Sequence, residues 1–221
     1  MKIKFLVDED FINYKKTSMF IGFPTCSFKC GIENCQNKNL INEKDIEMDY
    51  SSIIERYCNN KITSSIVCGG MEPFDSFKDL YELIYSLRIE YNNSDDVVIY
   101  TGYNEDEIKE LIDQITIFNN IVIKFGRYIP GDTPHKDDIL EVELASNNQY
   151  AKEYRRDSTK VFVNPDKKIV DKIRKKLSSN GGYCPCVRTV NDDNKCMCKE
   201  FRDKIANHEV CECHCGLYLN L

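Results

Sequence analysis

The sequence predicts an α/β protein whose parallel sheet is covered by helices, followed by a small cysteine-rich region. Two observations carry this prediction. Short apolar segments alternate with segments of helical periodicity through most of the 221 residues. The chain also has 12 cysteines, and seven of them lie between residues 184 and 215. Near Pro165 the alternating pattern gives way to one cationic helix and these cysteines, which predicts two domains, residues 1–164 and 165–221.

The first elements follow from apolar spacing. Residues 19–23 are a short apolar run ended by Pro24, which predicts the first strand. Residues 49–60 place apolar side chains at helical spacing, and Asp49 or Ser51 is the expected N-cap. The stretch SSIVCGG that follows predicts a buried strand running into glycines.

The alternation continues to the predicted domain boundary. A helix is expected at 75–90 and at 105–115, and a strand at 95–103, 119–128 and 139–145. Repeated βα units of this kind favour parallel strands, because each crossover needs room for a helix. After VFVNP comes a cationic helix over 166–177.

The overall charge and the absence of a long apolar segment limit the function classes. A net charge of −6 gives no general attraction to nucleic acid or to an anionic membrane, so neither is expected as a partner. No run approaches the ~20 apolar residues of a membrane span, and acidic residues 8–10 stand where an export signal would be apolar. We therefore expect a cytoplasmic protein whose cysteines serve metal or redox chemistry rather than structural disulfides.

The stretch FPTCSFKCGIENCQN places Cys26, Cys30 and Cys35 on one loop after the first strand. Three thiolates so placed would hold three irons of a 4Fe-4S cube and leave the fourth iron open to a ligand. The alternatives from the residues alone are a zinc site lacking its fourth ligand and three unrelated loop thiols.

Four further stretches make the first region similar to a known family. GGMEPF follows the second predicted strand, and IYTGY, KFGRYIPGD and ELASNNQYA follow in order. With the three cysteines, this series resembles the radical S-adenosylmethionine enzymes, and most closely the activating enzymes of anaerobic ribonucleotide reductase. The resemblance covers roughly residues 15–152.

The resemblance implies an incomplete parallel β/α barrel with the cluster at the carboxyl ends of its strands. It implies that S-adenosylmethionine chelates the open iron and is cleaved to a 5′-deoxyadenosyl radical, which abstracts hydrogen from a glycine of a partner enzyme. The cluster ligands it implies are Cys26, Cys30 and Cys35. The cofactor-binding residues are Gly69, Gly70, Met71, Glu72, Pro73, Ser146 and Asn147. Glycines there would let the backbone approach a ligand closely.

The first region departs from the family pattern at one point. Four residues separate Cys30 from Cys35 where the family has two, and Asn34 takes the place of an aromatic residue. This insertion favours a rival function, a ferredoxin-dependent disulfide reductase without radical catalysis.

The C-terminal cysteines form three Cys-x-Cys pairs with the sequences CPC, CMC and CHC. This order resembles the catalytic subunit of ferredoxin:thioredoxin reductase over roughly residues 165–221. From the residues alone, a zinc knuckle or a treble-clef zinc fold remains an alternative, and a zinc-stabilised binding module is the matching third function.

The second resemblance implies a small helical domain with a second 4Fe-4S cube. Its ligands are Cys184, Cys196, Cys198 and Cys213, while Cys186 and Cys215 form a redox-active disulfide and His214 moves a proton. Met197 replaces the family's proline, and the extra Cys211 is an alternative ligand to Cys213.

Together these features predict a radical S-adenosylmethionine oxidoreductase with a disulfide reductase-like domain. The expected protein substrate is a glycyl radical enzyme, the anaerobic ribonucleotide reductase. Ferredoxin, flavodoxin or thioredoxin is the expected redox partner, and the cationic helix after Pro165 is a candidate docking element for an acidic carrier.

Overall fold

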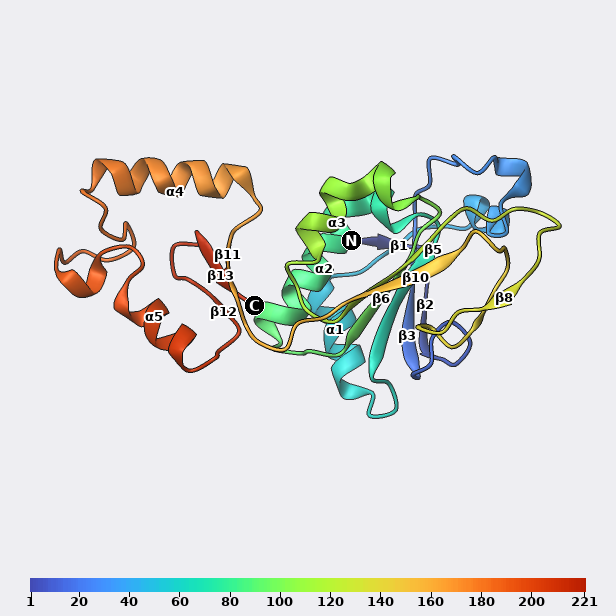
Figure 1. The fold of residues 1–221 in the computed structure, drawn as a ribbon, viewed down its shortest axis with the longest axis horizontal. Helices are drawn as coiled ribbons and strands as arrows, with labels where there is room; N and C mark the ends of the chain where they lie inside the picture. The colour runs from blue at the N-terminus through green and yellow to red at the C-terminus, as the bar shows by residue number, and fades with distance from the viewer. The chain divides into compact units, whose positions relative to one another are not determined.

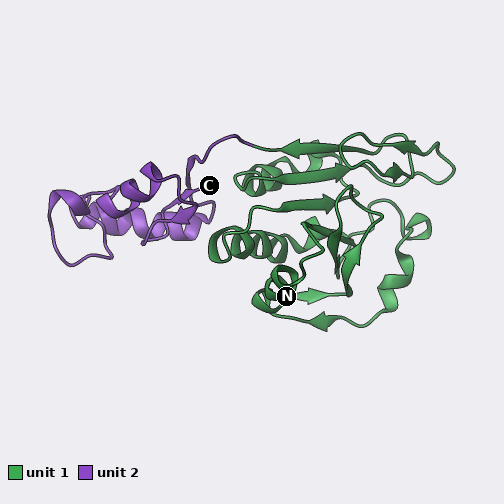
Figure 2. Ribbon diagram, turned by 90° about the horizontal axis from the view of Figure 1, so that it is seen from below, with its two compact units in different colours: residues 1–155 green, residues 156–221 purple.

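The computed structural model describes all 221 residues, which form two compact units, residues 1–155 and 156–221 (Figure 2). The second unit begins nine residues before Pro165, where the sequence analysis placed the start of the second domain. The shift arises from β11 (Val161–Val163), which was assigned to the first domain but pairs with β13 (Tyr218–Asn220) of the second unit. A strand of three residues is too short for its apolar alternation to indicate which strand it pairs with.

Unit 1 is built on a mixed sheet of six strands, which confirms the α/β class. Its strand order is β10-β7-β6-β5-β3-β2. The four central strands are parallel, as expected: β3 (Ser18–Phe23), β5 (Ser65–Gly70), β6 (Asp96–Tyr100) and β7 (Ile121–Phe125). The sequence analysis missed both antiparallel edge strands, β2 (Phe5–Asp10) and β10 (Tyr150–Tyr154), because their charged residues obscure the apolar alternation.

The helices of unit 1 connect successive parallel strands and lie on one face of the sheet (Figure 1). They are α1 (Tyr50–Asn59), α2 (Phe77–Tyr85) and α3 (Lys109–Ile115). A π-helical segment, η4 (Ser86–Glu90), extends α2, and the 3-10 turn η5 (Glu105–Ile108) precedes α3. Each helix buries an apolar stripe, such as Leu80, Leu83 and Ile84 of α2, so the predicted helical spacing is confirmed.

The opposite face of the sheet is covered by the chain between β7 and β10. Leu140 and Leu144 pack there against Val67, Val98 and Val122, which point away from the helices. The predicted strand over 139–145 is wrong for most of its length, because only β9 (Glu143–Leu144) pairs, with β8 (His135–Lys136). The Asp137 carboxylate accepts hydrogen bonds from two successive amides, at 139 and 140, and so forms a turn instead.

The remaining short elements lie in loops. They are β1 (Lys2–Ile3), β4 (Ile46–Glu47), η1 (Ile32–Asn34), η2 (Lys38–Asn42), η3 (Pro73–Ser76) and η6 (Asp192–Asn194). The β1 and β4 strands pair with each other. No helix in the chain has the length and apolar character needed to span a bilayer.

Unit 2 contains two helices, α4 (Lys167–Ser179) and α5 (Lys199–Ala206), and a three-stranded antiparallel sheet, β11-β13-β12. The prediction of a helical domain is therefore incomplete, since β12 (Cys211–Glu212) and β13 were not anticipated. The α4 helix begins where it was expected. Asp166 caps it, accepting from the amide of Lys168 at 2.8 Å.

Candidate functional site

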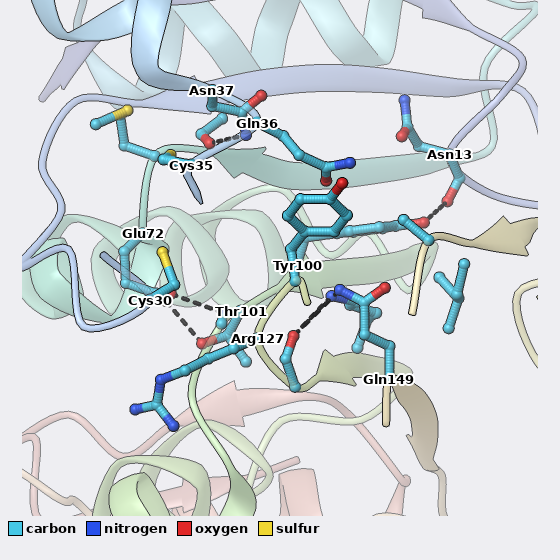
Figure 3. A pocket seen from close by; sticks show the side chains of 18 of the residues that line it. Asn13, Cys30, Cys35, Gln36, Asn37, Glu72, Tyr100, Thr101, Arg127 and Gln149 are labelled. Carbon is cyan, nitrogen blue, oxygen red and sulfur yellow. Dashed lines mark hydrogen bonds between the residues drawn. The ribbon is translucent and has the colours of Figure 1, made fainter. Parts of the chain in front are cut away.

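The loops that follow the parallel strands of unit 1 surround a cavity of about 360 Å³ (Figure 3). The carboxyl ends of parallel strands meet at one edge of a sheet, so residues far apart in sequence come together there. The labelled lining residues in Figure 3 come from the β2–β3 and β3–β5 connections, the segment after β5, the end of β6 and the segments around β7 and β10: Asn13, Cys30, Cys35, Gln36, Asn37, Glu72, Tyr100, Thr101, Arg127 and Gln149. This cavity joins the motifs that the sequence analysis singled out in unit 1.

All three predicted ligands of the first cluster line this cavity. Cys26, Cys30 and Cys35 are half-buried on the loop after β3. The inserted residues form the 3-10 turn η1, which begins after Gly31 at φ 82° and ends with the Cys35 amide donating to the Ile32 carbonyl at 3.3 Å. The insertion is thus taken up as a compact turn, and Cys35 still faces the same cavity as its two partners.

Three half-buried thiols on one loop are a donor set that fits an iron-sulfur cube, because cysteine thiolates hold such clusters. Burial raises the pKa of the Cys26 thiol to about 11 and also raises that of Cys30. Metal coordination reverses such a shift, because the bound cation deprotonates a ligating thiol. Nowhere in the chain do three or more His, Cys, Asp or Glu side chains converge on the position of a single metal ion.

The two glycines of GGMEPF are required by the packing of the strands. Gly70 has φ +81°, and a Cβ on it would lie 2.8 Å from Gly22 Cα of the neighbouring strand β3. A Cβ on Gly69 would lie 2.8 Å from the Phe20 ring. The sequence analysis attributed both glycines to a close-lying ligand. In this structure they let β3 and β5 approach, while Gly70 and Met71 also line the cavity.

Glu72 links the carboxyl ends of β5 and β6. Its buried carboxylate accepts hydrogen bonds from the Thr101 hydroxyl at 2.8 Å and from the Gly102 amide at 2.9 Å. Burial raises its pKa to about 7. Pro73 follows as the first residue of η3, where its missing N–H costs no hydrogen bond. Glu72 is therefore a cavity residue with a strongly perturbed carboxyl group, as catalytic and binding sites commonly contain.

Lys124 is a cavity residue that sequence reasoning missed. It lies on β7 and is buried, with Nζ donating to the Gly126 carbonyl at 3.0 Å and lying 5.9 Å from the centre of the Tyr100 ring. None of the chain's ion pairs includes it, and burial lowers its pKa to about 8. The sequence does contain a sign of it, because Lys124 is the one charged residue in the apolar run IVIKF.

Ser146 and Asn147 lie beside the cavity but do not line it. The Ser146 hydroxyl accepts from the Ile129 amide at 2.8 Å, and the Asn147 amide donates to Asp132 at 2.9 Å. Both therefore hold the loop after β7 in place. From the same stretch, Ala145 and Gln149 line the cavity, so the predicted segment is at the site through other residues.

The four predicted ligands of the second cluster surround one small cavity in unit 2. Cys184, Cys196, Cys198 and Cys213 line it, together with His214 and Cys215. Cys184 and Cys213 are buried. Cys213 belongs to the core of this unit with Phe201 and Leu217. Cys211 lies outside this cavity, on β12.

Of the predicted redox pair, Cys215 lines the same cavity and Cys186 does not. Cys186 is exposed, and its thiol donates to the His214 carbonyl at 3.8 Å. All twelve cysteines carry free thiols in this structure, so the Cys186–Cys215 disulfide stays a prediction. The Cys215 and Cys213 sulfurs lie 3.5 Å apart. This hydrogen bond lowers the pKa of Cys213 to about 6 and raises that of Cys215, which favours Cys213 as the thiolate of the two.

Comparison with known proteins found one match, which spans the region of the first of these two sites. Residues 15–150 match the family model described as a 4Fe-4S single cluster domain. The match contains Cys26, Cys30 and Cys35 and ends before the C-terminal cysteines. No match was found among curated proteins or among solved structures. Because the model covers more than half of the chain, the protein belongs to the 4Fe-4S single cluster domain family.

Proposed function

We propose that the protein is a radical S-adenosylmethionine enzyme that activates a glycyl radical enzyme of the anaerobic ribonucleotide reductase type. The observation that carries this proposal is the position of Cys26, Cys30 and Cys35 on the rim of a large cavity at the carboxyl ends of parallel strands. A family whose model describes one 4Fe-4S cluster supports the metal. The sequence motifs of the first region support the reaction.

The sheet of unit 1 suits an incomplete β/α barrel. The parallel strands follow one another in chain order, β3-β5-β6-β7, and their helices lie on one face of the sheet. The cavity lies at the carboxyl ends of these strands. In a barrel of this kind the reaction takes place at the carboxyl ends of the strands, inside the curve of the sheet. The Val67, Val98 and Val122 face would be the barrel interior.

The chain's own residues would bind and orient the cofactor. Cys26, Cys30 and Cys35 would hold three irons and leave the fourth for the amino and carboxylate groups of S-adenosylmethionine. A reduced cube bound there would supply the one electron needed to cleave S-adenosylmethionine to methionine and a 5′-deoxyadenosyl radical. The Lys124 ammonium is a buried cation without a carboxylate partner, so it would bind the cofactor's carboxylate. Glu72 would accept from the amino group.

The position of the cavity between buried strands would also protect a reactive intermediate. Phe5, Phe20 and Leu144 line its inner wall, and side chains of this kind exclude water. A partner's glycine loop would have to enter from the open side, near Asn13 and the exposed Ile12.

Unit 2 would supply electrons or exchange thiols. We propose that Cys184, Cys196, Cys198 and Cys213 bind a second 4Fe-4S cube, with Cys186 and Cys215 as the exchanging pair. Reducing their disulfide takes two electrons and two protons, and a cube bound there would supply the electrons one at a time, received from ferredoxin or flavodoxin. His214 is exposed next to Cys215 and would carry a proton.

The test is anaerobic reconstitution with iron and sulfide, reduction, and mixing with S-adenosylmethionine. We expect release of 5′-deoxyadenosine, which Cys30→Ala abolishes. Cys58→Ala is the matched control, because Cys58 is also a half-buried free thiol but lies on α1, outside the cavity. A reconstituted protein that releases no 5′-deoxyadenosine would contradict the proposal.

A second candidate function is a ferredoxin-dependent disulfide reductase without radical chemistry. The exposure of Cys186 beside a group of buried cysteines favours it, because thiol exchange needs an accessible sulfur. Reduction of thioredoxin without release of 5′-deoxyadenosine would select this function, and Cys186→Ser should then abolish it.

A further inference from the structure

We propose that Tyr103 and Asp75 are positioning residues for the first cluster, holding the turn between Cys26 and Cys30 in the shape that the cube requires. The inference rests on the 4Fe-4S site of the proposed function and assigns to it two residues outside the ligand set. Tyr103 ends the stretch IYTGY and Asp75 follows GGMEPF, and both belong to elements other than the cysteine loop.

Asp75, on η3, binds the loop from one side. Its carboxylate accepts from the Ser27 amide at 2.5 Å and from the Tyr103 hydroxyl at 2.6 Å. The Tyr103 hydroxyl also lies 3.1 Å from the Ser27 hydroxyl. Ser27, the residue after the first ligand, is therefore fixed through both its main chain and its side chain.

Tyr103 binds the other side of the same turn with its ring. The Lys29 ammonium lies 4.5 Å from the ring centre, a cation–π distance, and Lys29 directly precedes Cys30. Tyr103 is itself buried and rigidly placed, because its amide donates to Thr101 at 3.0 Å and its carbonyl accepts from Gly126 at 3.1 Å. One side chain thus contacts the residues on both sides of Phe28.

Phe28 is the residue that this arrangement controls. It has φ 53°, a left-handed conformation that a bulky residue rarely adopts without support. In that conformation its amide donates to the Cys26 sulfur at 3.2 Å. Amide hydrogen bonds to a ligand sulfur stabilise its negative charge and raise the reduction potential of an iron-sulfur cluster. Losing the support at Ser27 should free Phe28 and weaken this bond.

The test compares Tyr103→Phe with Tyr50→Phe in the full chain carrying Cys196→Ala and Cys198→Ala, so that only the first site binds a cluster. Tyr50 is a matched control, because its hydroxyl also donates to an aspartate, Asp79, at 2.6 Å but lies on α1. We expect Tyr103→Phe to release iron to a chelator about 10-fold faster, as loss of one charge-assisted hydrogen bond predicts. Its cluster should have a more negative reduction potential and an altered electron paramagnetic resonance spectrum. Tyr50→Phe should match the parent in all three.

Asp75→Asn is the second variant, and it keeps the Tyr103 side chain intact. A shift in reduction potential and spectrum in both Tyr103→Phe and Asp75→Asn would support the positioning role of the two residues. This holds even if neither variant nor the parent releases 5′-deoxyadenosine, because that result would contradict only the proposed function. Potential, spectrum and iron release equal to the parent in folded Tyr103→Phe or Asp75→Asn would overturn the pair. Iron binding that survives Cys26→Ala, Cys30→Ala and Cys35→Ala together would overturn both proposals.

Discussion

The two cysteine groups of this protein are held in opposite ways. In unit 1 the three thiols lie half-buried on a loop beyond a sheet whose core is made of apolar residues such as Val67, Val98 and Val122. In unit 2 the core itself contains Cys213 beside Val170 and Phe201, and four more cysteines and Met197 pack against this core. The first unit presents its predicted ligands on a loop outside its core, whereas the second unit uses some of its predicted ligands as part of its core.

The two units also differ in charge. Unit 2 has 13 Lys and Arg against 9 Asp and Glu, a net charge of +4, so the chain's total of −6 leaves −10 for unit 1. Six of the basic residues lie on α4, all exposed: Lys167, Lys168, Lys172, Arg174, Lys175 and Lys176. None of them forms an ion pair within the chain. A carrier with an acidic surface would therefore be attracted to unit 2 and repelled by unit 1.

The largest expected effect is on folding when iron is removed. A chelator under reducing conditions should unfold unit 2, because small domains that use ligands as core depend on their metal, and should leave residues 1–155 folded. Hydrogen exchange and limited proteolysis would measure this, with the iron-loaded protein as control. Equal protection of both units in the iron-free protein would contradict the difference in how their cysteines are held.

The next effect concerns the buried Lys124 of unit 1. Its pKa is lowered from 10.5 to about 8, so below pH 8 the folded state bears the full cost of the buried charge. Between pH 8 and 10.5 the folded state has lost this proton and the unfolded state has not, so this contribution to stability rises with pH. Lys124→Met should raise the free energy of unfolding by about 3 kcal/mol at pH 7, and by progressively less above pH 8.

Urea unfolding of the Lys124→Met variant and the parent at pH 7 and pH 9.5 would measure that difference. The Gly126 carbonyl keeps a donor in the variant, because Gln149 Nε2 also donates to it at 3.3 Å. A stability difference between variant and parent that is the same at both pH values would contradict the lowered pKa of Lys124.

A smaller effect is expected from the charge of α4. Changing Lys168, Lys172 and Lys175 to Glu should slow reduction of unit 2 by an acidic ferredoxin about 10-fold at low salt, because attraction becomes repulsion. The difference should fade in high salt, where the charges are screened. Stopped-flow absorbance would measure the rate.

The control carries the same charge change on unit 1, in Lys44, Lys78 and Lys109, which are also exposed lysines without an ion pair. Equal slowing by both triple variants would indicate that net charge alone governs docking, and that α4 is not the contact.

The smallest expected effect is on the stability of unit 1 when the three predicted cluster ligands, Cys26, Cys30 and Cys35, become alanine. These side chains lie on a loop and only half-buried, so the free energy of unfolding of iron-free unit 1 should change by less than about 1 kcal/mol. Thermal unfolding followed by circular dichroism would measure this. A large loss of stability would mean that the first loop, like the second group, contributes to a core.

Sequence patterns predicted the central sheet and the three helices of unit 1 well, because residues such as Ile66, Leu80 and Ile123 occur in runs of clear period. They failed for edge strands and for 139–145, where Asp137 decided the conformation through hydrogen bonds to amides two and three residues away. Short strands such as β12 could not be predicted, because two residues show no alternation.

The same division holds for the candidate sites. The three cysteines of unit 1 were predicted from their spacing and the four predicted ligands of unit 2 from a family resemblance, and each set lines one cavity. Lys124 and Tyr103 could not be assigned from spacing, because they reach the first site from β7 and from the end of β6.

The sequence by itself determined the local order: which segments form helices and central strands, and which loops carry closely spaced thiols. Only the tertiary structure decided which segments meet, because parallel strands bring Gly70, Thr101, Lys124 and Cys26 to one edge from a hundred residues of chain. The spacing of residue types along the chain reflects the contacts that a residue makes within its own turn or strand. The partners of a buried lysine or a loop-holding tyrosine depend on long-range packing, which no local pattern contains.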